Sequence, residues 1–338
     1  MTSEGYAYKN LKVVPTTAKT VNYNKLVEIL CSKDEKLMEE NAWIWNGHNY
    51  FLDGTVHLND PSIANHVQFT SFPRSGNSFL RRLIENVTGI ETGSCMPAEL
   101  TALMPIIGMK GESNKDDKIW VCKSHYPLVA PLDLKTPPFF ANKTFMVVRN
   151  PFDVINSYTQ LLNTFTHDAV VEFDYLRDHP EWWHKWVKMT TLKIKWFFDT
   201  IWRQFIDEKQ NPIYFVRYED LVLNKKDTLM GLFSFILGKK DLKGTNIERR
   251  IDKIVSMGLA GSKSYALKST TGKFNIHIKK YPPELRQFIQ ETLRELSYRF
   301  GYANVNLDDE SPAIIELKKN REGIKDKITP ETAFFEHK

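Results

Sequence analysis

The stretch "FTSFPRSGNSFLRRLIE", residues 69–85, predicts a β-strand that ends in a tight turn and continues as a helix. Its apolar start stops at Pro73, and a basic residue, a glycine and three small polar residues follow. After the turn the apolar residues recur at helical spacing, and Gly89 occupies the position that commonly follows a helix end. One face of this helix carries Phe79, Leu80, Leu83, Ile84 and Val87.

The rest of the chain repeats this alternation of apolar strands and amphipathic helices. Strands are predicted at residues 66–72, 119–125, 144–150 and 212–220. Helices are predicted at residues 77–89, from Pro151 onward, and at residues 190–206, 225–237 and 283–300. Strands that are separated by helices favour a parallel sheet with helices on both faces. We therefore predict an α/β fold with a central, mainly parallel sheet flanked by helices.

Three parts of the chain differ in composition. Residues 1–60 are aromatic and irregular in pattern, and we predict an N-terminal segment that packs on the main domain. Residues 61–303 carry the alternating pattern without a Gly/Ser-rich linker, which predicts one domain. Residues 304–338 are rich in charge and are predicted to form a charged C-terminal tail.

Composition narrows the classes of function. The formal net charge of the 338 residues is only +5, which suits an anionic ligand better than a nucleic-acid surface. The sequence has three cysteines and no CxxC, so we expect reduced thiols and a cytoplasmic setting. We find no apolar signal core, no stretch long enough to span a bilayer, and no His, Cys or Asp cluster at metal-ligand spacing.

The turn after the first strand has the features of an oxyanion cradle. Ligands of an open α/β sheet bind beyond the carboxyl ends of the strands, and Gly76 lets the backbone approach closely. Backbone N–H groups at the start of a helix favour an anion, and Arg74 adds a fork of donors that suits phosphate or sulfate. The turn is not a Walker A loop, because position 77 is asparagine where that loop has lysine. An ordinary turn that caps a helix is the plainer interpretation of this stretch alone.

Four motifs together resemble the sulfotransferases that use 3′-phosphoadenosine-5′-phosphosulfate (PAPS). "SFPRSGNSF" (71–79) is similar to the loop that binds the 5′-phosphosulfate, and "RNPFDVINSY" (149–158) to the motif that binds the 3′-phosphate. "KSHYP" (123–127) is similar to the stretch that carries the catalytic base, and "RYED" (217–220) to a Tyr-Glu-Asp that follows a later strand. The motifs follow the family order over roughly residues 65–275. The resemblance implies a three-layer P-loop-NTPase-like fold, a sulfotransferase domain at 61–303, and PAPS as cosubstrate without a metal.

The resemblance also implies the catalytic residues. His125 would take a proton from the acceptor, a role that suits its ordinary pKa of about 6.5. Lys123 lies two positions earlier, on the same face if the strand continues, and would stabilise charge on the sulfuryl group. Arg74 stands where many relatives have lysine, keeps the positive charge and changes its geometry.

The cosubstrate-binding residues follow from the same alignment of motifs. The loop contributes Arg74, Ser75, Gly76, Asn77, Ser78 and Phe79. Arg149 and Ser157 keep the family's eight-residue spacing for the 3′-phosphate, and Tyr218 and Phe79 are implied to lie near the adenine. Lys268, in "LKSTTGKF" (267–274), aligns with a basic position of a later loop, where Ser269 replaces a glycine and Leu267 an arginine.

We therefore predict an enzyme of EC 2.8.2 type that transfers a sulfuryl group from PAPS to a hydroxyl, or as second choice an amine, of a small-molecule acceptor. In-line displacement with His125 as base is the expected mechanism. Neither a nucleic acid nor a membrane is expected as partner, and the oligomeric state stays open. Two alternatives stay open as well: a P-loop-like nucleotide kinase or NTPase, and a protein that binds PAP without chemistry.

Overall fold

The structure is a computed structural model, and it describes residues 19–46, 56–59, 66–96, 110–112, 114–115, 118–128, 141–164, 178–208, 211–257 and 277–302. Its centre is a five-stranded sheet of order β4-β5-β3-β6-β7, in which every pairing is parallel. The strands are β3 (Val67–Ser71), β4 (Gly93–Ser94), β5 (Val121–Lys123), β6 (Lys143–Val148) and β7 (Ile213–Arg217). The predicted parallel sheet is thus confirmed.

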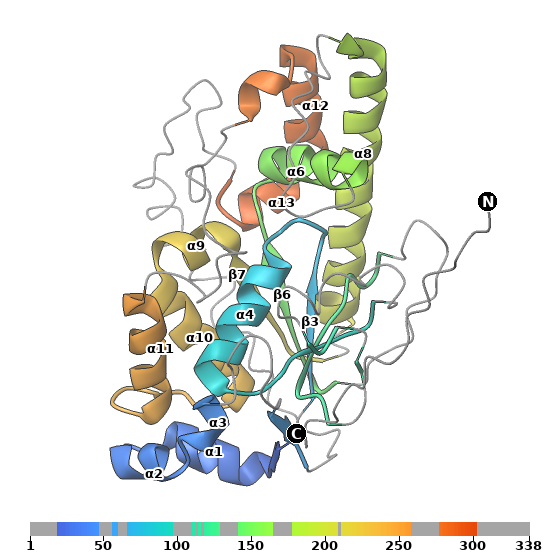
Figure 1. Cartoon of the computed structure of the whole chain (residues 1–338). Helices are drawn as coiled ribbons and strands as arrows, with labels where there is room; N and C mark the ends of the chain where they lie inside the picture. The colour runs from blue at the N-terminus through green and yellow to red at the C-terminus, as the bar shows by residue number, and fades with distance from the viewer. Residues whose placement is uncertain are drawn as a thin grey trace, which may run out of the picture.

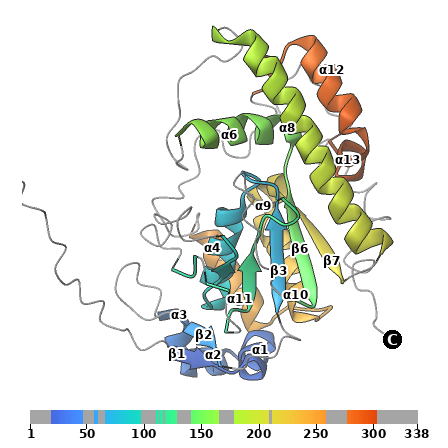
Figure 2. The ribbon, with the colours of Figure 1, turned by 90° about the vertical axis from the view of Figure 1, so that its right-hand side faces the viewer.

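Helices cover both faces of this sheet (Figures 1 and 2). One side carries α4 (Asn77–Thr88), α9 (Tyr218–Leu223), α10 (Lys225–Leu237) and α11 (Asn246–Ser256). The other side carries α8 (Pro180–Ile201), and α6 (Pro151–Thr164), α12 (Pro283–Thr292) and α13 (Arg294–Arg299) lie with it toward one end of the strands. The three-layer arrangement of the predicted fold class is confirmed.

Strand alternation explains why both faces are covered. On β6, Phe145 and Val147 belong to the hydrophobic cluster that includes α4, α10 and α11. Met146 and Val148, one residue out of step, belong to the second cluster, which includes α6, α8 and α12. All four side chains are fully buried. Because successive strand residues point to opposite faces, a strand that is apolar throughout requires a helical layer on each side.

A small unit from the N-terminal part packs beneath the main sheet. It consists of the parallel strands β1 (Lys19–Val21) and β2 (Val56–Leu58) with α1 (Tyr23–Cys31), α2 (Glu35–Glu40) and α3 (Trp43–Asn46). The Asn246 amide of α11 donates to the carbonyls of Ile29 and Asp34, at 3.0 and 2.8 Å. Trp45 donates to the Val87 carbonyl at 2.9 Å and lies under Arg250. Polar contacts and apolar packing both join this unit to α4 and α11.

Several predicted boundaries differ from the structure. The long helix starts at Pro180 rather than at residue 190, because proline fits a first helical position where no N–H partner is needed. It continues after Ile201 as a π-helix (Trp202–Asp207). The strands at 119–125 and 212–220 are shorter than predicted, and the helix predicted at 283–300 is two helices that meet at Leu293. Within the described ranges no helix is both long and apolar enough to cross a bilayer.

The order of the strands determines where a ligand can bind. The chain runs from β3 outward to β5 on one side and to β6 on the other. In an open parallel sheet, such a switch point leaves a crevice at the carboxyl ends of the two neighbouring strand pairs. The segments that follow β3, β5 and β6 carry the predicted loop, the predicted base and the predicted 3′-phosphate motif.

Candidate active site

The loop between β3 and α4 turns sharply at two residues in the left-handed region. Arg74 has φ of 72° and Gly76 has φ of 100°. The Ser75 N–H donates to the Phe72 carbonyl at 3.2 Å, which closes the turn. Left-handed backbone is rare for residues with a side chain and gathers at ligand sites. At Gly76 a side chain is also excluded by space, since a Cβ would lie 2.8 Å from Cε2 of Tyr218.

The start of α4 offers backbone and side-chain groups to an anion. Gly76 is the N-cap and has no side chain with which to cap, so the N–H groups of Asn77, Ser78 and Phe79 have no acceptor within the helix. The Asn77 amide donates to the Ser71 hydroxyl at 3.0 Å. Its Oδ1 is buried without a hydrogen-bond partner in the described part of the chain. The three N–H groups suit a phosphate or sulfate, the class of ligand predicted for this loop, whereas the Asn77 oxygen can only accept a hydrogen bond.

Arg74 and the predicted 3′-phosphate motif converge at this loop. Arg74 Nε donates to the Ser157 hydroxyl at 2.9 Å, across from α6. Arg149, which follows β6, donates from Nη1 to the Arg74 carbonyl at 2.9 Å. The Arg149 guanidinium lies 4.5 Å from the ring centre of Tyr218. Three motifs that are far apart in sequence therefore form one cationic, aromatic cluster.

Phe79 closes the same cluster from the α4 side. Its ring meets Tyr218 edge-on, with centroids 6.4 Å apart, and Lys225 lies 5.9 Å from its centre. Burial raises the pKa of Tyr218, while the nearby Arg149 and Arg74 act in the opposite direction. Tyr218 begins α9 rather than ending a strand, so its ring lies against Gly76. The arrangement places two aromatic rings beside cations suited to phosphate.

A buried set of hydrogen bonds fixes Arg149 and Tyr218 through their chain neighbours. Glu219 accepts from the Asn150 N–H at 2.9 Å and from the Tyr302 hydroxyl at 2.7 Å. Arg217 binds Asp220 through two nitrogens, at 2.9 and 2.8 Å. Burial raises the pKa of Tyr302 well above its usual range, so it remains a donor. The ends of β6 and β7 are thereby held together, which limits the freedom of the residues between them.

His125 lies at the carboxyl end of the neighbouring strand pair. Its Nδ1 is 2.7 Å from the Ser71 carbonyl oxygen. A carbonyl can only accept, so Nδ1 carries the proton and the neutral ring has its lone pair on Nε2. The Thr70 hydroxyl donates to the Tyr126 carbonyl at 2.6 Å and ties the two strand ends together. The side chain is half-buried and held in the tautomer that a general base requires.

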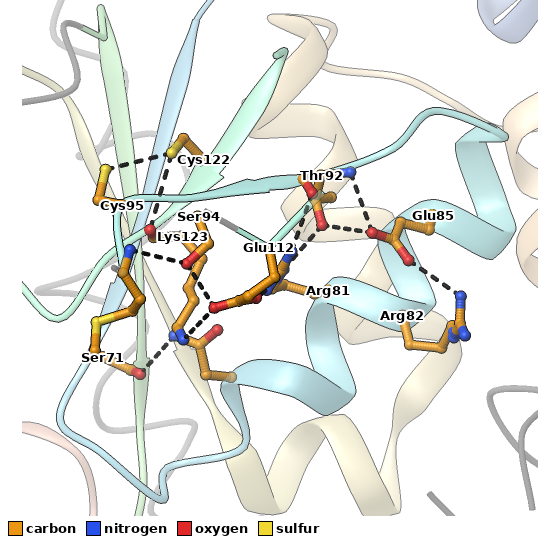
Figure 3. Close-up of polar contacts among 12 residues, drawn as sticks. Ser71, Arg81, Arg82, Glu85, Thr92, Ser94, Cys95, Glu112, Cys122 and Lys123 are labelled. Atoms are coloured by element: carbon orange, nitrogen blue, oxygen red, sulfur yellow. Dashed lines mark hydrogen bonds and ion pairs between the residues drawn. The ribbon is translucent and has the colours of Figure 1, made fainter. Parts of the chain in front are cut away.

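Lys123 takes a different place from the one that simple strand alternation predicts. β5 ends at Lys123, so the alternation does not extend to His125. The lysine is buried, and its Nζ lies 3.5 Å from Oε1 of Glu112 (Figure 3). Burial lowers its pKa, against the opposing effect of Glu112. The ammonium belongs to a charged network beneath the loop, which also includes Arg81 of α4.

Sequence reasoning missed two residues near this site. Glu112 lies in the polar stretch "KGES", which carries no local signal of burial. His277 lies in a basic stretch, and burial, followed by Lys280 and Arg149, lowers its pKa to about 4. A neutral imidazole beside Arg149 is compatible with an anion site. Of the predicted residues, Lys268 lies outside the described residues, and the described ranges contain no group of three or more His, Cys, Asp or Glu that could hold a metal.

Comparison with known proteins identifies the family. Residues 65–257 of the chain, more than half of its length, match the family described as the sulfotransferase domain. The chain belongs to the sulfotransferase family. No curated protein matches this sulfotransferase.

Two solved structures are similar to this sulfotransferase. Mouse sulfotransferase SULT7A1 complexed with PAP is 16% identical, with 75% of this chain and 88% of that chain covered and a TM-score of 0.43. Retinol dehydratase in complex with androsterone and inactive cofactor PAP is 14% identical, with 82% of this chain and 95% of that chain covered and a TM-score of 0.37. The family assignment rests on the sequence match over residues 65–257.

Proposed function

We propose that this sulfotransferase transfers the sulfuryl group of PAPS to a hydroxyl group of a small-molecule acceptor. The observation that carries the proposal is the convergence of Arg74, Arg149 and Ser157 at the loop that follows β3, whose last residue also contacts His125. Arg149 donates to the Arg74 carbonyl, and Arg74 donates to Ser157. His125 is bonded to Ser71, the last residue of the strand that leads into the same loop. An amine acceptor is the second choice.

PAPS supplies an activated S–O bond to its 5′-phosphate, and the residues of this chain would bind both of its charged ends. The loop N–H groups and Arg74 suit the phosphosulfate, and Arg149 and Ser157 suit the 3′-phosphate. Phe79 and Tyr218 provide aromatic surfaces for the adenine. Arg149 is a fitting anion ligand, since it forms no ion pair with any carboxylate of the described ranges. Lys268 remains a predicted contributor from outside those ranges.

His125 would act as the base in an in-line displacement. Its Nε2 takes the proton of the acceptor hydroxyl while the new O–S bond forms and the S–O bond to the 5′-phosphate breaks. Arg74, Lys123 and the loop N–H groups would hold the sulfuryl oxygens and stabilise the negative charge that the departing phosphate gains. Products are the sulfated acceptor, PAP and a proton that His125 releases to water. A cytoplasmic setting remains a prediction.

Mass spectrometry can test the transfer directly. The protein is incubated with isotopically labelled PAPS and a metabolite extract, and the products are examined for addition of one labelled sulfuryl group. We expect at least one acceptor to be labelled, with formation of PAP and without added metal. If the wild-type protein binds PAP but labels no acceptor in extracts of several sources, the non-catalytic PAP-binding alternative is supported instead.

Ligand-induced stabilisation separates the proposal from a nucleotide kinase or NTPase. A ligand that binds the folded state raises the midpoint of thermal unfolding. We expect PAP alone to stabilise the protein more than ATP with magnesium, because the loop has Asn77 in place of the P-loop lysine. Stabilisation by ATP with magnesium and none by PAP would contradict the proposal.

A further inference from the structure

Glu112 lies at the centre of a buried network that joins three elements of the site (Figure 3). Its side chain is 1% exposed. It forms an ion pair with Arg81 of α4, accepts from the Ser94 hydroxyl of β4 at 2.8 Å, and lies 3.5 Å from Lys123 Nζ of β5. No other carboxylate in the described ranges forms an ion pair with Lys123.

The carboxylate stays ionised because these groups surround it. Burial opposes the charged form, but the cations Arg81 and Lys123 and the donated hydrogen bonds hold the pKa of Glu112 at about 2. The dependence is mutual, since a buried ammonium without a counter-charge tends to lose its proton. Lys123 can therefore serve as a cation at this depth only with a carboxylate close by.

Glu112 does not saturate the lysine. Arg81 takes the close contact, whereas the Lys123 contact of 3.5 Å is at the limit of a hydrogen bond. An ammonium has three N–H donors, and a single oxygen, Oε1, accepts one of them. Glu112 is also a single carboxylate between two cations, Arg81 and Lys123. A positive charge and donors thus remain for an anion.

We propose that Glu112 is a positioning residue for sulfuryl transfer, which fixes the Lys123 ammonium between β5 and α4 as its counter-charge and leaves its other donors for the sulfuryl oxygens. This inference rests on the proposed function. Glu112 itself touches neither the loop nor His125 in any contact described above, so it acts through Lys123. Arg81 connects the same carboxylate to α4, the helix whose first turn forms the proposed anion cradle.

A merely structural role is the competing explanation, and Glu85 provides the matched control. Glu85 is also buried, with 3% exposure, and also belongs to this network. It accepts from the Thr92 N–H and hydroxyl, at 3.1 and 2.6 Å, and forms an ion pair with Arg82. It has no contact with Lys123. Glu85→Gln and Glu112→Gln should therefore both lower stability, but only Glu112→Gln should change the pKa of Lys123.

The pH dependence of kcat provides the test. The titratable and charged groups that face Lys123 are Glu112, Arg81, Cys122 and Cys95. The hydrogen bond between the two thiols, together with burial, raises the pKa of Cys122, and the same hydrogen bond lowers the pKa of Cys95. We expect kcat to fall at alkaline pH as Lys123 loses its proton, and Lys123→Arg to abolish this alkaline fall. In Glu112→Gln we expect the alkaline fall to begin about one to three pH units lower than in the wild type. Above the lowered pKa of Lys123, kcat should drop about tenfold for each further pH unit. Glu112→Asp should give a smaller displacement in the same direction, and Glu85→Gln none.

A second measurement does not require turnover. Carbon-13 NMR of protein labelled at lysine Cε follows the titration of Lys123, whose signal is identified by its loss in Lys123→Arg. We expect the pKa of Lys123 to fall in Glu112→Gln and to be unchanged in Glu85→Gln. If Glu112→Gln does not fold, Glu112→Asp is compared with the wild type in its place.

The outcomes separate the two proposals. A wild-type protein that transfers no sulfuryl group and binds no PAP would overturn the proposed function and this inference with it. A protein that transfers sulfuryl groups, with the same alkaline fall and the same Lys123 titration in the wild type and the Glu112 variants, would overturn this inference alone. A shift of the alkaline fall and of the Lys123 titration to lower pH in the Glu112 variants, with no shift of either in Glu85→Gln, supports this inference.

Discussion

Arg149 donates a hydrogen bond to the backbone carbonyl of Arg74, and this contact of 2.9 Å joins the segments that follow β6 and β3. Arg74 in turn donates to Ser157 on α6, eight residues beyond Arg149. The loop proposed for the 5′-phosphosulfate and the residues proposed for the 3′-phosphate therefore hold each other in place. A ligand that binds one end also fixes the backbone that binds the second, which favours ligands with both charged groups.

Replacement of Arg149 by lysine should weaken PAP binding selectively. Lysine keeps the charge but loses the planar fork and the stacking on Tyr218, so we expect PAP affinity to fall about tenfold or more. The affinity for adenosine 5′-monophosphate, which has no 3′-phosphate, should fall much less. Isothermal titration with both nucleotides measures the difference.

Arg250→Lys is the matched control for this change. Arg250 also lies over an aromatic ring, 5.1 Å from the centre of Trp45, and also donates to a backbone carbonyl, that of Asn86 at 2.6 Å. The Arg250→Lys protein should be less stable than the wild type, with unchanged PAP affinity. Equal losses of PAP and adenosine 5′-monophosphate affinity in Arg149→Lys would show that Arg149 does not bind the 3′-phosphate.

His125→Ala should remove most of the turnover and leave cosubstrate binding intact. Loss of a general base lowers kcat by about 10²–10⁴-fold. The His125 ring is bonded to the Ser71 carbonyl rather than to Arg74 or Arg149, so PAP affinity should change little. The measurements are steady-state kinetics and PAP titration. His184→Ala, which removes a half-buried histidine 3.1 Å from Glu284, should retain activity. Full turnover in His125→Ala would overturn the assignment of the base.

Gly76→Ala should disrupt the anion loop more than backbone strain alone explains. A left-handed residue with a side chain is strained by about 1 kcal/mol. At Gly76 the added Cβ also meets the Tyr218 ring, so we expect a loss in the free energy of unfolding of more than about 2 kcal/mol, together with loss of PAP binding. Gly244 has a similar φ of 75° but no atom nearer than 4.0 Å to an added Cβ. Urea unfolding of Gly76→Ala and Gly244→Ala should therefore differ, and equal stability of the two would contradict the role of Tyr218.

His277 should make the folded state less stable in mild acid. Its pKa is lowered from 6.5 to about 4, chiefly by burial. Between these values the unfolded chain binds more protons than the folded protein, so this contribution is complete above pH 6.5 and is lost as pH falls toward 4. The difference amounts to at most about 3 kcal/mol. Glu112, whose pKa is about 2, changes mainly at lower pH.

Chemical unfolding at several pH values checks this prediction. We expect His277→Gln to flatten the dependence of unfolding free energy on pH in the range between 4 and 6.5. His179→Gln, which changes the exposed N-cap residue of α8, should leave the pH dependence unchanged. A slope that persists in His277→Gln would assign the effect to other groups.

Much of the fold follows from local sequence patterns. The apolar run before Pro73 and the helical spacing after it predict β3, the turn and α4, and the eight-residue spacing places Arg149 just before α6 and Ser157 within it. The strand–helix alternation predicts the parallel sheet. The predicted helix start at residue 190 is wrong, because apolar spacing alone does not mark a helix end and Pro180 already provides the start.

Local patterns indicate which residues stand at strand ends, because periodicity and turn residues act over a few neighbours in the chain. Three contacts follow from the three-dimensional packing instead: Arg149 reaches the Arg74 carbonyl, Tyr218 lies against Gly76, and Glu112 lies beside Lys123. These contacts depend on the strand order β4-β5-β3-β6-β7, which brings distant segments to one edge of the sheet. Local sequence spacing does not reveal that order. The polar stretch around Glu112 likewise does not indicate that its carboxylate is buried beside two cations.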